Sequence, residues 1–359
     1  MMKTNTRKAT NNAEAPKAST IKLGLDVHAD SVSVVRQIDG ASPQPAQKFK
    51  WERFWPWAAK QKQLAESVHS VYEAGPFGYG THRRLEEMGI SNLVVRPQNW
   101  DDLGKGVKTD KADALALAQR LDRYVNGNTK ALAVVHVPTP EQEILRSQTR
   151  LREQLRGMRQ KVEAQGRSMM LYYGVRVKGR WWGARQWPRL SKELPKEIRV
   201  MAEHFREIVL AAHAKVTKLT LEIEAAAPKN RPKGYGKLTT ETLGREILDW
   251  SRFTNRRQVA SITGLCPRVH SSGSRHSQGA ISKHGNPRIR QAAIETAWRL
   301  CRFQPNYWAL RRWQAALSGP SPAARKKAIV AIARHLVIDL WRLNTGRTTA
   351  EKLGLVLSA

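Results

Sequence analysis

The sequence predicts an α/β N-terminal domain, a stalk of two long paired helices and a mostly helical C-terminal domain. Three observations predict this order. Over residues 20–138, stretches with apolar residues at every second position alternate with stretches of helical spacing, which is typical of an α/β layer fold. Over residues 139–227, charged residues dominate and apolar residues recur three and four apart. Residues 228–350 keep helical spacing but contain Gly- and Ser-rich breaks.

The first domain begins after a polar segment, residues 1–19, which has no apolar period and is expected to be a disordered basic tail. Ile21, Leu23 and Leu25 then alternate with small or polar residues and predict a strand. In chain order we next expect a strand at 32–36, a helix at about 51–68, a strand end at 70–73, a helix at 82–88, a strand at 92–96, a helix at 111–121 and a last strand at 132–137.

The stalk is expected to consist of helices at 139–172 and 191–227, paired as an antiparallel coiled coil. The insertion between them, near 174–190, interleaves basic residues with tryptophans, among them Arg180, Trp181, Trp182 and Arg185. These residues could contact the backbone and the unstacked bases of a nucleic acid. Alternatively, the tryptophans form a hydrophobic plug at the tip of the helix pair.

Composition favours a nucleic-acid partner. The chain has 62 Lys and Arg against 30 Asp and Glu, a formal net charge of +32, which suits a polyphosphate ligand. Its two cysteines, Cys266 and Cys301, argue against a disulfide framework or a zinc site and fit a reducing compartment. There is no apolar run of the roughly 18 residues that span a bilayer, so we expect no membrane partner and a cytoplasmic location.

Four acidic residues stand out in this basic chain, namely Asp26, Glu73, Asp110 and Asp113. The first two end predicted strands, and the last two lie three apart on one helix face. Carboxylates that converge in this way can hold two Mg²⁺ ions about 3.5–4 Å apart for phosphodiester cleavage. Each acid alone could be solvated, and Asp110 could simply cap its helix. As a set, they predict an RNase H-like nuclease core.

A second cluster lies in residues 264–290, where Ser, Gly, His and basic residues are concentrated. Its candidate phosphate contacts are Arg268, Arg275, Lys283 and Arg290. The segment could be a flexible basic loop, or it could supply a serine nucleophile. A Ser-His hydrolase is disfavoured because there is no Gly-x-Ser-x-Gly elbow. A helix is expected to restart near Pro287.

The motifs together resemble a known family. Gly24-Leu-Asp26, Glu73-Ala-Gly-Pro and Lys108-Thr-Asp110-Lys-Ala-Asp113-Ala occur in the order found in the DEDD transposases of insertion-sequence family one hundred and ten. The C-terminal part of the resemblance comprises Gly264-Leu-Cys-Pro267, Ser272-Gly273, Gly279-Ala-Ile-Ser282-Lys283, Gly285-Asn286 and Arg290. In all, about residues 21–345 are similar.

The resemblance implies a RuvC-like domain, a coiled-coil stalk and a helical transposase domain. It further implies that the four acids coordinate Mg²⁺ and that Ser272 is the nucleophile, which forms a phosphoserine link to DNA. Family members include bridge-RNA-guided serine recombinases, so a structured guide RNA, donor and target DNA and a homotetramer are implied partners. A serine also stands at position 271, and the family's Pro-Gly-x-Gly is weakened here to Gly234-x-Gly236.

Two other functions fit parts of the pattern. A RuvC-like nuclease would cut branched DNA with metal-activated water and leave Ser272 structural. A non-catalytic protein would bind nucleic acid through its net positive charge alone. The four acids would then have no catalytic role.

Overall fold

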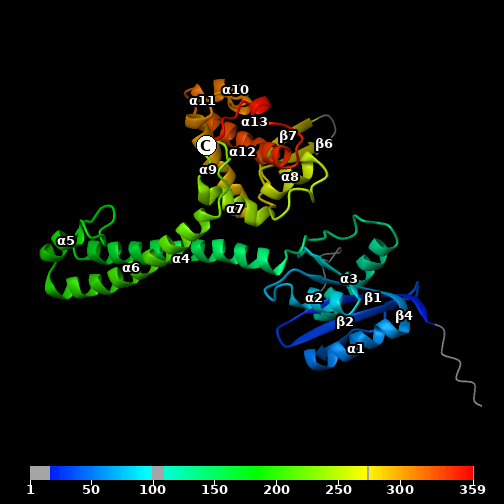
Figure 1. The fold of residues 1–359 in the computed structure, drawn as a ribbon. Helices are drawn as coiled ribbons and strands as arrows, with labels where there is room; N and C mark the ends of the chain where they lie inside the picture. The colour runs from blue at the N-terminus through cyan, green and yellow to red at the C-terminus, as the bar shows by residue number, and fades with distance from the viewer. Residues whose placement is uncertain (1–16, 99–108, 273–274, 359) are drawn as a thin grey trace, which may run out of the picture. The chain divides into compact units, whose positions relative to one another are not determined.

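The computed structural model describes residues 17–98, 109–272 and 275–358. It divides into two compact units, Met1–Val137 and Pro138–Ala359 (Figure 1). The first unit contains β1 (Ala18–Val27), β2 (Ser31–Ile38), β3 (Gln47–Lys50), α1 (Trp51–Leu64), β4 (Ala65–Glu73), α2 (Gly80–Glu87), β5 (Ser91–Val95) and α3 (Asp110–Val125).

The strands of the first unit form one five-stranded sheet in the order β3-β2-β1-β4-β5. β1 pairs with β2 in antiparallel fashion and with β4 in parallel fashion, and β4 pairs in parallel with β5. Leu25 of β1 is in register with Tyr72 of β4. The carboxyl ends of β1 and β4 therefore meet at the same edge of the sheet.

Helices cover both faces of this sheet. On one face, Ile21, Leu23 and Leu25 pack with Phe54 of α1 and with Leu85 of α2. On the other face, α3 packs on the sheet through two further apolar groups, made of Val71, Val95, Leu117, Leu121 and Leu132 and of Val35, Ala114 and Ala118. The α/β class that the sequence predicts is thus confirmed, with alternate residues of β1 facing opposite layers.

Several element boundaries differ from the sequence expectations. The helix expected at 51–68 ends at Leu64, because Ala65 has extended backbone angles and begins β4. β3 was not expected, since its sequence, Gln-Lys-Phe-Lys, lacks a clear apolar alternation. At 132–137 the expected strand is reduced to one bridge between Val134 and Val95. Residues 1–16 of the expected tail lie outside the described residues, and β1 already begins at Ala18.

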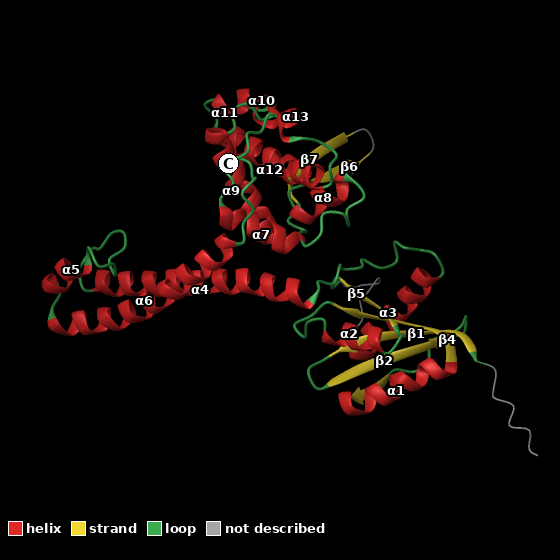
Figure 2. Cartoon of the chain, viewed as in Figure 1, coloured by secondary structure: helices red, strands yellow, loops and turns green. Residues whose placement is uncertain are grey.

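The second unit begins with two long helices, α4 (Pro140–Tyr172) and α6 (Lys196–Ala225), joined through α5 (Trp187–Glu193) and lying side by side (Figure 2). Arg152 of α4 bonds Thr220 of α6, whereas Gly166 contacts Phe205, so the pair is antiparallel. α4 starts with a capping box formed by Thr139 and Gln142. We call this helix pair the stalk.

The rest of the second unit is mainly helical. It contains α7 (Lys237–Ile247), α8 (Arg256–Thr263), β6 (Pro267–Ser272), β7 (Arg275–Ile281), α9 (Pro287–Phe303), α10 (Trp308–Arg312), α11 (Gln314–Ser318), α12 (Pro322–Asn344) and α13 (Ala350–Leu353). Its core is built mostly from α9 and α12, with Ile289, Leu300, Ile332 and Leu336 fully buried. The helix expected near Pro287 is confirmed, while the preceding Ser/Gly-rich segment forms an antiparallel hairpin.

Candidate active site

The carboxylates of the first unit are positioned by the packing of α3 on β1. Lys22 is 4% exposed, and its ammonium lies 2.5 Å from the carboxylate of Asp122 near the end of α3. Two residues further along β1, a Cβ atom on Gly24 would lie 2.5 Å from the backbone nitrogen of Ala118 and would also collide with the carbonyl of Ala114. Only glycine allows this close approach of strand and helix.

The same register continues to Asp26. The β1 positions that face α3 are Lys22, Gly24 and Asp26, and their partners run backward along α3, from Asp122 through Ala118 and Ala114, which both face Gly24, to Asp110. Asp26 consequently lies opposite the first turn of α3, which carries Asp110 and Asp113. Strand and helix periodicities together bring acids that are 84 residues apart to one place.

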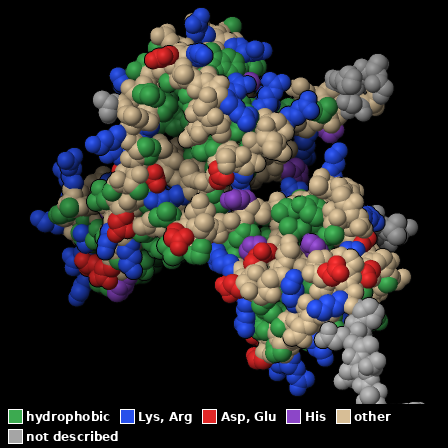
Figure 3. Space-filling view, turned by 45° about the vertical axis from the view of Figure 1, so that its right-hand side comes forward, with side chains coloured by type: hydrophobic (Ala, Val, Ile, Leu, Met, Phe, Trp, Pro, Cys, Tyr) green, Lys and Arg blue, Asp and Glu red, His purple; other side chains and the backbone are tan. Residues whose placement is uncertain are grey.

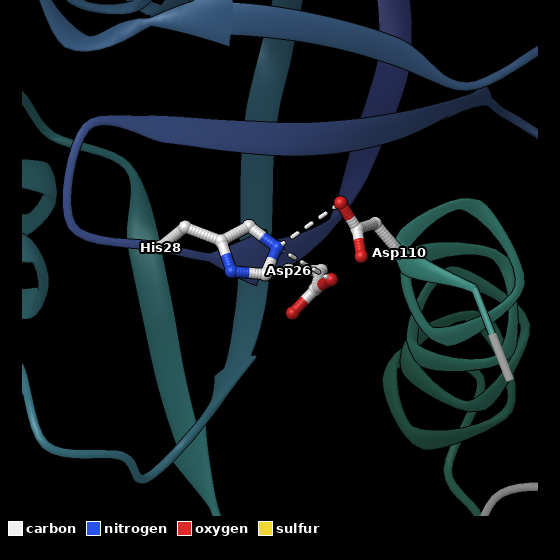
Figure 4. Close-up of side chains that lie close together, drawn as sticks. All are labelled: Asp26, His28 and Asp110. Carbon is white, nitrogen blue, oxygen red and sulfur yellow. Dashed lines mark hydrogen bonds and ion pairs between the residues drawn. The ribbon is translucent and has the colours of Figure 1, made fainter.

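A compact group of three side chains results (Figure 4). His28 Nε2 lies 3.2 Å from Oδ2 of Asp26 and 3.3 Å from Oδ2 of Asp110. The ligand atoms of these three residues all lie within 4.8 Å of one another. Lys48 Nζ of β3 also reaches Asp110 Oδ2, at 3.2 Å. An imidazole and an ammonium thus lie where a metal ion would otherwise balance the carboxylates.

The pKa values reflect this crowding. Partial burial raises the pKa of Asp26, His28 opposes that shift, and the negative charges of Asp110 and Asp113 raise the pKa further. The hydrogen bond from Lys48 lowers the pKa of Asp110. A cation bound between these carboxylates would favour their charged forms.

The other predicted acids lie close by but outside the compact group. Asp113 is one helical turn from Asp110, and its charge acts on Asp26. Glu73 is the last residue of β4, next to Asp26 by strand register, and its Oε1 accepts a hydrogen bond from the backbone of Gln98 at 3.2 Å. The alternative that Asp110 caps α3 is wrong, because Thr109 is the N-cap and accepts from Ala112.

The donor set fits a divalent metal ion. Carboxylate oxygens are preferred by Mg²⁺ and also suit Mn²⁺, whereas an imidazole nitrogen suits Zn²⁺. Asp26, Asp110 and His28 would be the nearest ligands, with Asp113 and Glu73 able to approach from the same sheet edge. Such an ion would supply Lewis-acid stabilisation of a phosphate.

His28 and Lys48 were missed by the sequence reasoning. The signal for His28 was present, because Asp26-Val-His28 places two ligand-type side chains at alternate positions of an extended segment. Lys48 carried no such signal, since β3 was not recognised. It reaches the site because Lys48 pairs with Ser33 of β2, which in turn pairs with Asp26.

The candidate nucleophile, Ser272, is in the second unit. It is exposed at the end of β6, in register with Arg275 at the start of β7. Gly273 and Ser274 lie outside the described residues. An exposed hydroxyl near the turn of a two-stranded ribbon is accessible to a large substrate such as DNA.

The base of this hairpin is held by two backbone segments that nearly touch. A Cβ atom on Gly285 would lie 2.5 Å from the nitrogen of Gly264, and Lys283 donates its N–H to the Gly264 carbonyl at 3.0 Å. Gly264 has φ +63°, which ends α8 in the left-handed region. The glycines of the Gly264-Leu and Gly285-Asn motifs are therefore explained by this crossing.

A buried carboxylate ties the same base to the stalk. Glu246 of α7, whose side chain is 1% exposed, accepts two hydrogen bonds of 2.8 Å from Arg150 of α4. It also accepts one of 2.7 Å from Asn286, the N-cap residue of α9. Arg288 bonds Glu153 of α4 at 2.6 Å. The root of the stalk and the base of the hairpin thus share one polar network.

The basic residues proposed for phosphate contact have different surroundings. Arg268 and Lys283 are exposed, and Lys283 has φ +59°. Arg275 begins β7 beside the hairpin turn. Arg290 instead donates from Nη1 to the carbonyls of Thr263 and Lys283, both at 3.3 Å. Arg290 therefore supports the crossing beneath the hairpin.

The Trp/Arg-rich insertion near 174–190 had two interpretations, a nucleic-acid contact or a hydrophobic plug at the tip of the helix pair. The structure shows its tryptophans packed as a plug. Trp181 and Trp182 are 1% and 2% exposed. Trp181 packs against Gly166, where an added Cβ would lie 2.6 Å from the indole, and it donates from Nε1 to the Glu163 carbonyl. The two indoles are therefore not available to stack on bases, whereas Arg180 and Arg185 are exposed.

We expect Gly24→Ala to destabilise the first unit and to displace the first turn of α3. The added methyl group meets helix backbone, which cannot rotate away, and overpacking of this kind costs about 1–3 kcal/mol. Thermal unfolding followed by circular dichroism would measure the loss. The matched control is Gly40→Ala, because a Cβ at Gly40 has no atom within 4 Å. Equal melting temperatures for the two variants would contradict the tight β1–α3 contact.

Comparison with known proteins identifies the family. The model of the Transposase IS116/IS110/IS902 family matches residues 230–314. The transposase y4rJ of Sinorhizobium fredii is 33% identical to this chain over 308 residues, and the alignment covers 77% of each chain. The chain belongs to the IS116/IS110/IS902 transposase family. The resemblance inferred from the motifs is thereby confirmed.

More distant relatives extend the same similarity. The transposase for insertion sequence element IS1111A of Coxiella burnetii is 26% identical, over 75% of each chain. The transposase for IS1533 of Leptospira borgpetersenii is 22% identical, over 77% of this chain and 84% of its own. Membership supports a transposase function and a metal-dependent site.

Among the described helices, none is both long and apolar enough to cross a bilayer.

Proposed function

We propose that this protein is the transposase of an insertion sequence and that it cuts and rejoins DNA with a Mg²⁺-bound carboxylate site and a serine nucleophile. The observation that carries the proposal is the group formed by Asp26, His28 and Asp110 at one sheet edge, in a chain that also presents Ser272 at an exposed hairpin. The sheet with acids at the ends of β1 and β4 supports an RNase H-like (RuvC-like) core.

In this proposal Asp26, Glu73, Asp110 and Asp113 hold the metal, which stabilises charge on the scissile phosphate when bound. In the structure His28 Nε2 contacts both Asp26 and Asp110, and the same nitrogen could become a further ligand when the ion binds. Lys48 keeps one oxygen of Asp110 in place. The chain's own contribution is a set of carboxylates held at the right separation before the substrate arrives.

The Ser272 oxygen attacks the scissile phosphorus. A bond from phosphorus to serine forms as the bond to a deoxyribose oxygen breaks, the hydroxyl proton is released, and the leaving oxygen takes up a proton. Each step exchanges one phosphoester for another, so a DNA hydroxyl can reverse the reaction without ATP. As in the family, the serine of one subunit is proposed to act at the carboxylates of another, within a tetramer.

The proposed partners are donor and target DNA and a structured guide RNA. The net charge of +32 supports polyanion binding. Of this excess, half lies from Ser251 onward, where 19 Lys and Arg stand against 3 Asp and Glu. Basic side chains are spread over the face shown in Figure 3.

A trapping assay tests the proposal. The full-length protein is incubated with Mg²⁺, the RNA transcribed from the flanks of its gene and end-labelled element DNA, and the reaction is stopped with denaturant. We expect a labelled protein–DNA adduct that survives denaturation and disappears after protease treatment. Cleaved DNA with free 5′-phosphate ends and no adduct would instead identify a RuvC-like nuclease, and unchanged DNA would favour a non-catalytic binding protein.

A further inference from the structure

We propose that the stalk carries a binding site for the phosphodiester backbone of a nucleic acid. The site is a hollow between α4 and α6, which we call the stalk groove, lined by Arg152, Arg156, Arg159, Arg180, His213 and Thr217. This inference does not depend on the metal site or on the serine nucleophile.

The lining of the stalk groove is cationic. The hollow has a volume of about 270 Å³, and the described residues that line it include four arginines but neither Asp nor Glu. Arg152, Arg156 and Arg159 follow one another at helical spacings of four and three, so they share one face of α4. Four guanidinium groups gathered around one hollow, with no acid in its wall, favour an anionic ligand.

The groove continues in both directions along α4. One neighbouring hollow shares Arg152 and Arg156 and adds Arg288. Another shares Arg159 and Arg180 and adds Arg167. Of the acids that line these two ends, Glu153 bonds Arg288, Glu163 bonds both Arg159 and Arg167, and the exposed Glu295 accepts a hydrogen bond from Gln291. A track of this kind suits a polymer of phosphates better than a single small anion.

Two arginines of the stalk groove, Arg159 and Arg180, contact Trp182 of the hydrophobic plug. The Arg159 and Arg180 guanidinium carbons lie 5.6 and 5.8 Å from the centre of the buried Trp182 ring, which has His213 at 5.0 Å on an edge-to-face contact. Nε of Arg159 is buried and, in the structure, lacks a hydrogen-bond partner. Trp182 therefore serves nucleic-acid binding indirectly, because it holds guanidinium groups in place and does not stack on bases.

The electrostatics of the groove agree with this placement. Burial and the neighbouring Arg156 charge lower the pKa of Arg152. Burial, together with the charges of Arg159 and Arg180, lowers the pKa of His213. Repulsion among the guanidinium groups would be relieved by a bound polyanion, which also releases counterions.

The test compares two double variants that lose the same charge. Arg156→Gln/Arg180→Gln removes two guanidiniums from the groove, whereas Arg189→Gln/Arg199→Gln removes two exposed ones outside it. Binding of the full chain to a mixed-sequence DNA duplex and to an RNA hairpin is measured in EDTA at several salt concentrations. EDTA prevents metal-dependent cleavage, so the result does not depend on the proposed chemistry.

We expect the groove variant to bind about tenfold more weakly than the control variant and to lose about two units of salt slope, since each phosphate contact contributes about 0.9. A loss for DNA alone, for RNA alone or for both supports the proposal and identifies the ligand. Losses no greater than those of the control, for both ligands, would overturn it. A second variant, Thr217→Glu, adds a carboxylate at an exposed position of the groove and should weaken binding likewise.

Discussion

Replacing Asp26 by asparagine is expected to reduce DNA cleavage by about 10³-fold. The amide keeps the shape of the side chain and can still bond His28 Nε2, but it removes the negative charge at the centre of the compact group. Stabilisation of a phosphoryl-transfer transition state by a bound metal is worth several kcal/mol, and each 1.36 kcal/mol corresponds to a factor of ten in rate. Single-turnover cleavage of labelled element DNA would measure the effect.

The control for this variant is Asp30→Asn, which neutralises an exposed acid four residues along the chain. It should retain the wild-type rate. Titration with Mn²⁺, followed by electron paramagnetic resonance, measures metal affinity independently of activity. Asp26→Asn should lower the affinity of the protein for Mn²⁺. Wild-type cleavage by Asp26→Asn would show that the carboxylate group at this sheet edge is not the catalytic metal site.

The second large effect is expected for Ser272→Ala, which should abolish the covalent protein–DNA adduct. Without the hydroxyl oxygen there is no atom on this residue to form the bond to phosphorus. Because Ser272 is exposed at the end of β6, the substitution should change the free energy of unfolding by less than about 0.5 kcal/mol. Denaturing gel electrophoresis of the trapped complex provides the measurement.

Ser271→Ala is the matched control, because it removes a neighbouring hydroxyl on the same strand. The two residues pair with different partners in the backbone register of the hairpin, Ser272 with Arg275 and Ser271 with His276. An adduct that persists in Ser272→Ala and is lost in Ser271→Ala would reassign the nucleophile.

The sequence predicted the strands and helices with strong periodicity and the places of the acids. β1 and α3 were recognisable because their apolar residues recur with periods close to 2 and 3.6. The hairpin of β6 and β7 was not recognisable, since Arg, His, Ser and Gly give it no apolar alternation. Its form depends on backbone pairing and on the glycine crossing at Gly264 and Gly285, which are distant in sequence.

Side-chain roles were harder to predict than positions. Asp26 and Asp110 were identified by residue type, but Lys48 reaches Asp110 only through the order of three strands, which no local pattern reveals. Likewise, Arg290 looks like a phosphate ligand in sequence, yet its guanidinium bonds two carbonyls beneath the hairpin. Sequence patterns report periodicity, whereas these contacts arise from tertiary packing.

The fit of α3 against β1 makes the spacing between helix residues as important as their identity. Lys22 meets Asp122, Gly24 meets Ala118, and Asp26 meets Asp110. One residue inserted between Asp113 and Ala118 would rotate the start of the helix by about 100° relative to its end. Both acids would then turn away from Asp26 while every residue of the motif remained. A copy of the gene could thus keep every motif and still encode a protein in which these carboxylates no longer lie together.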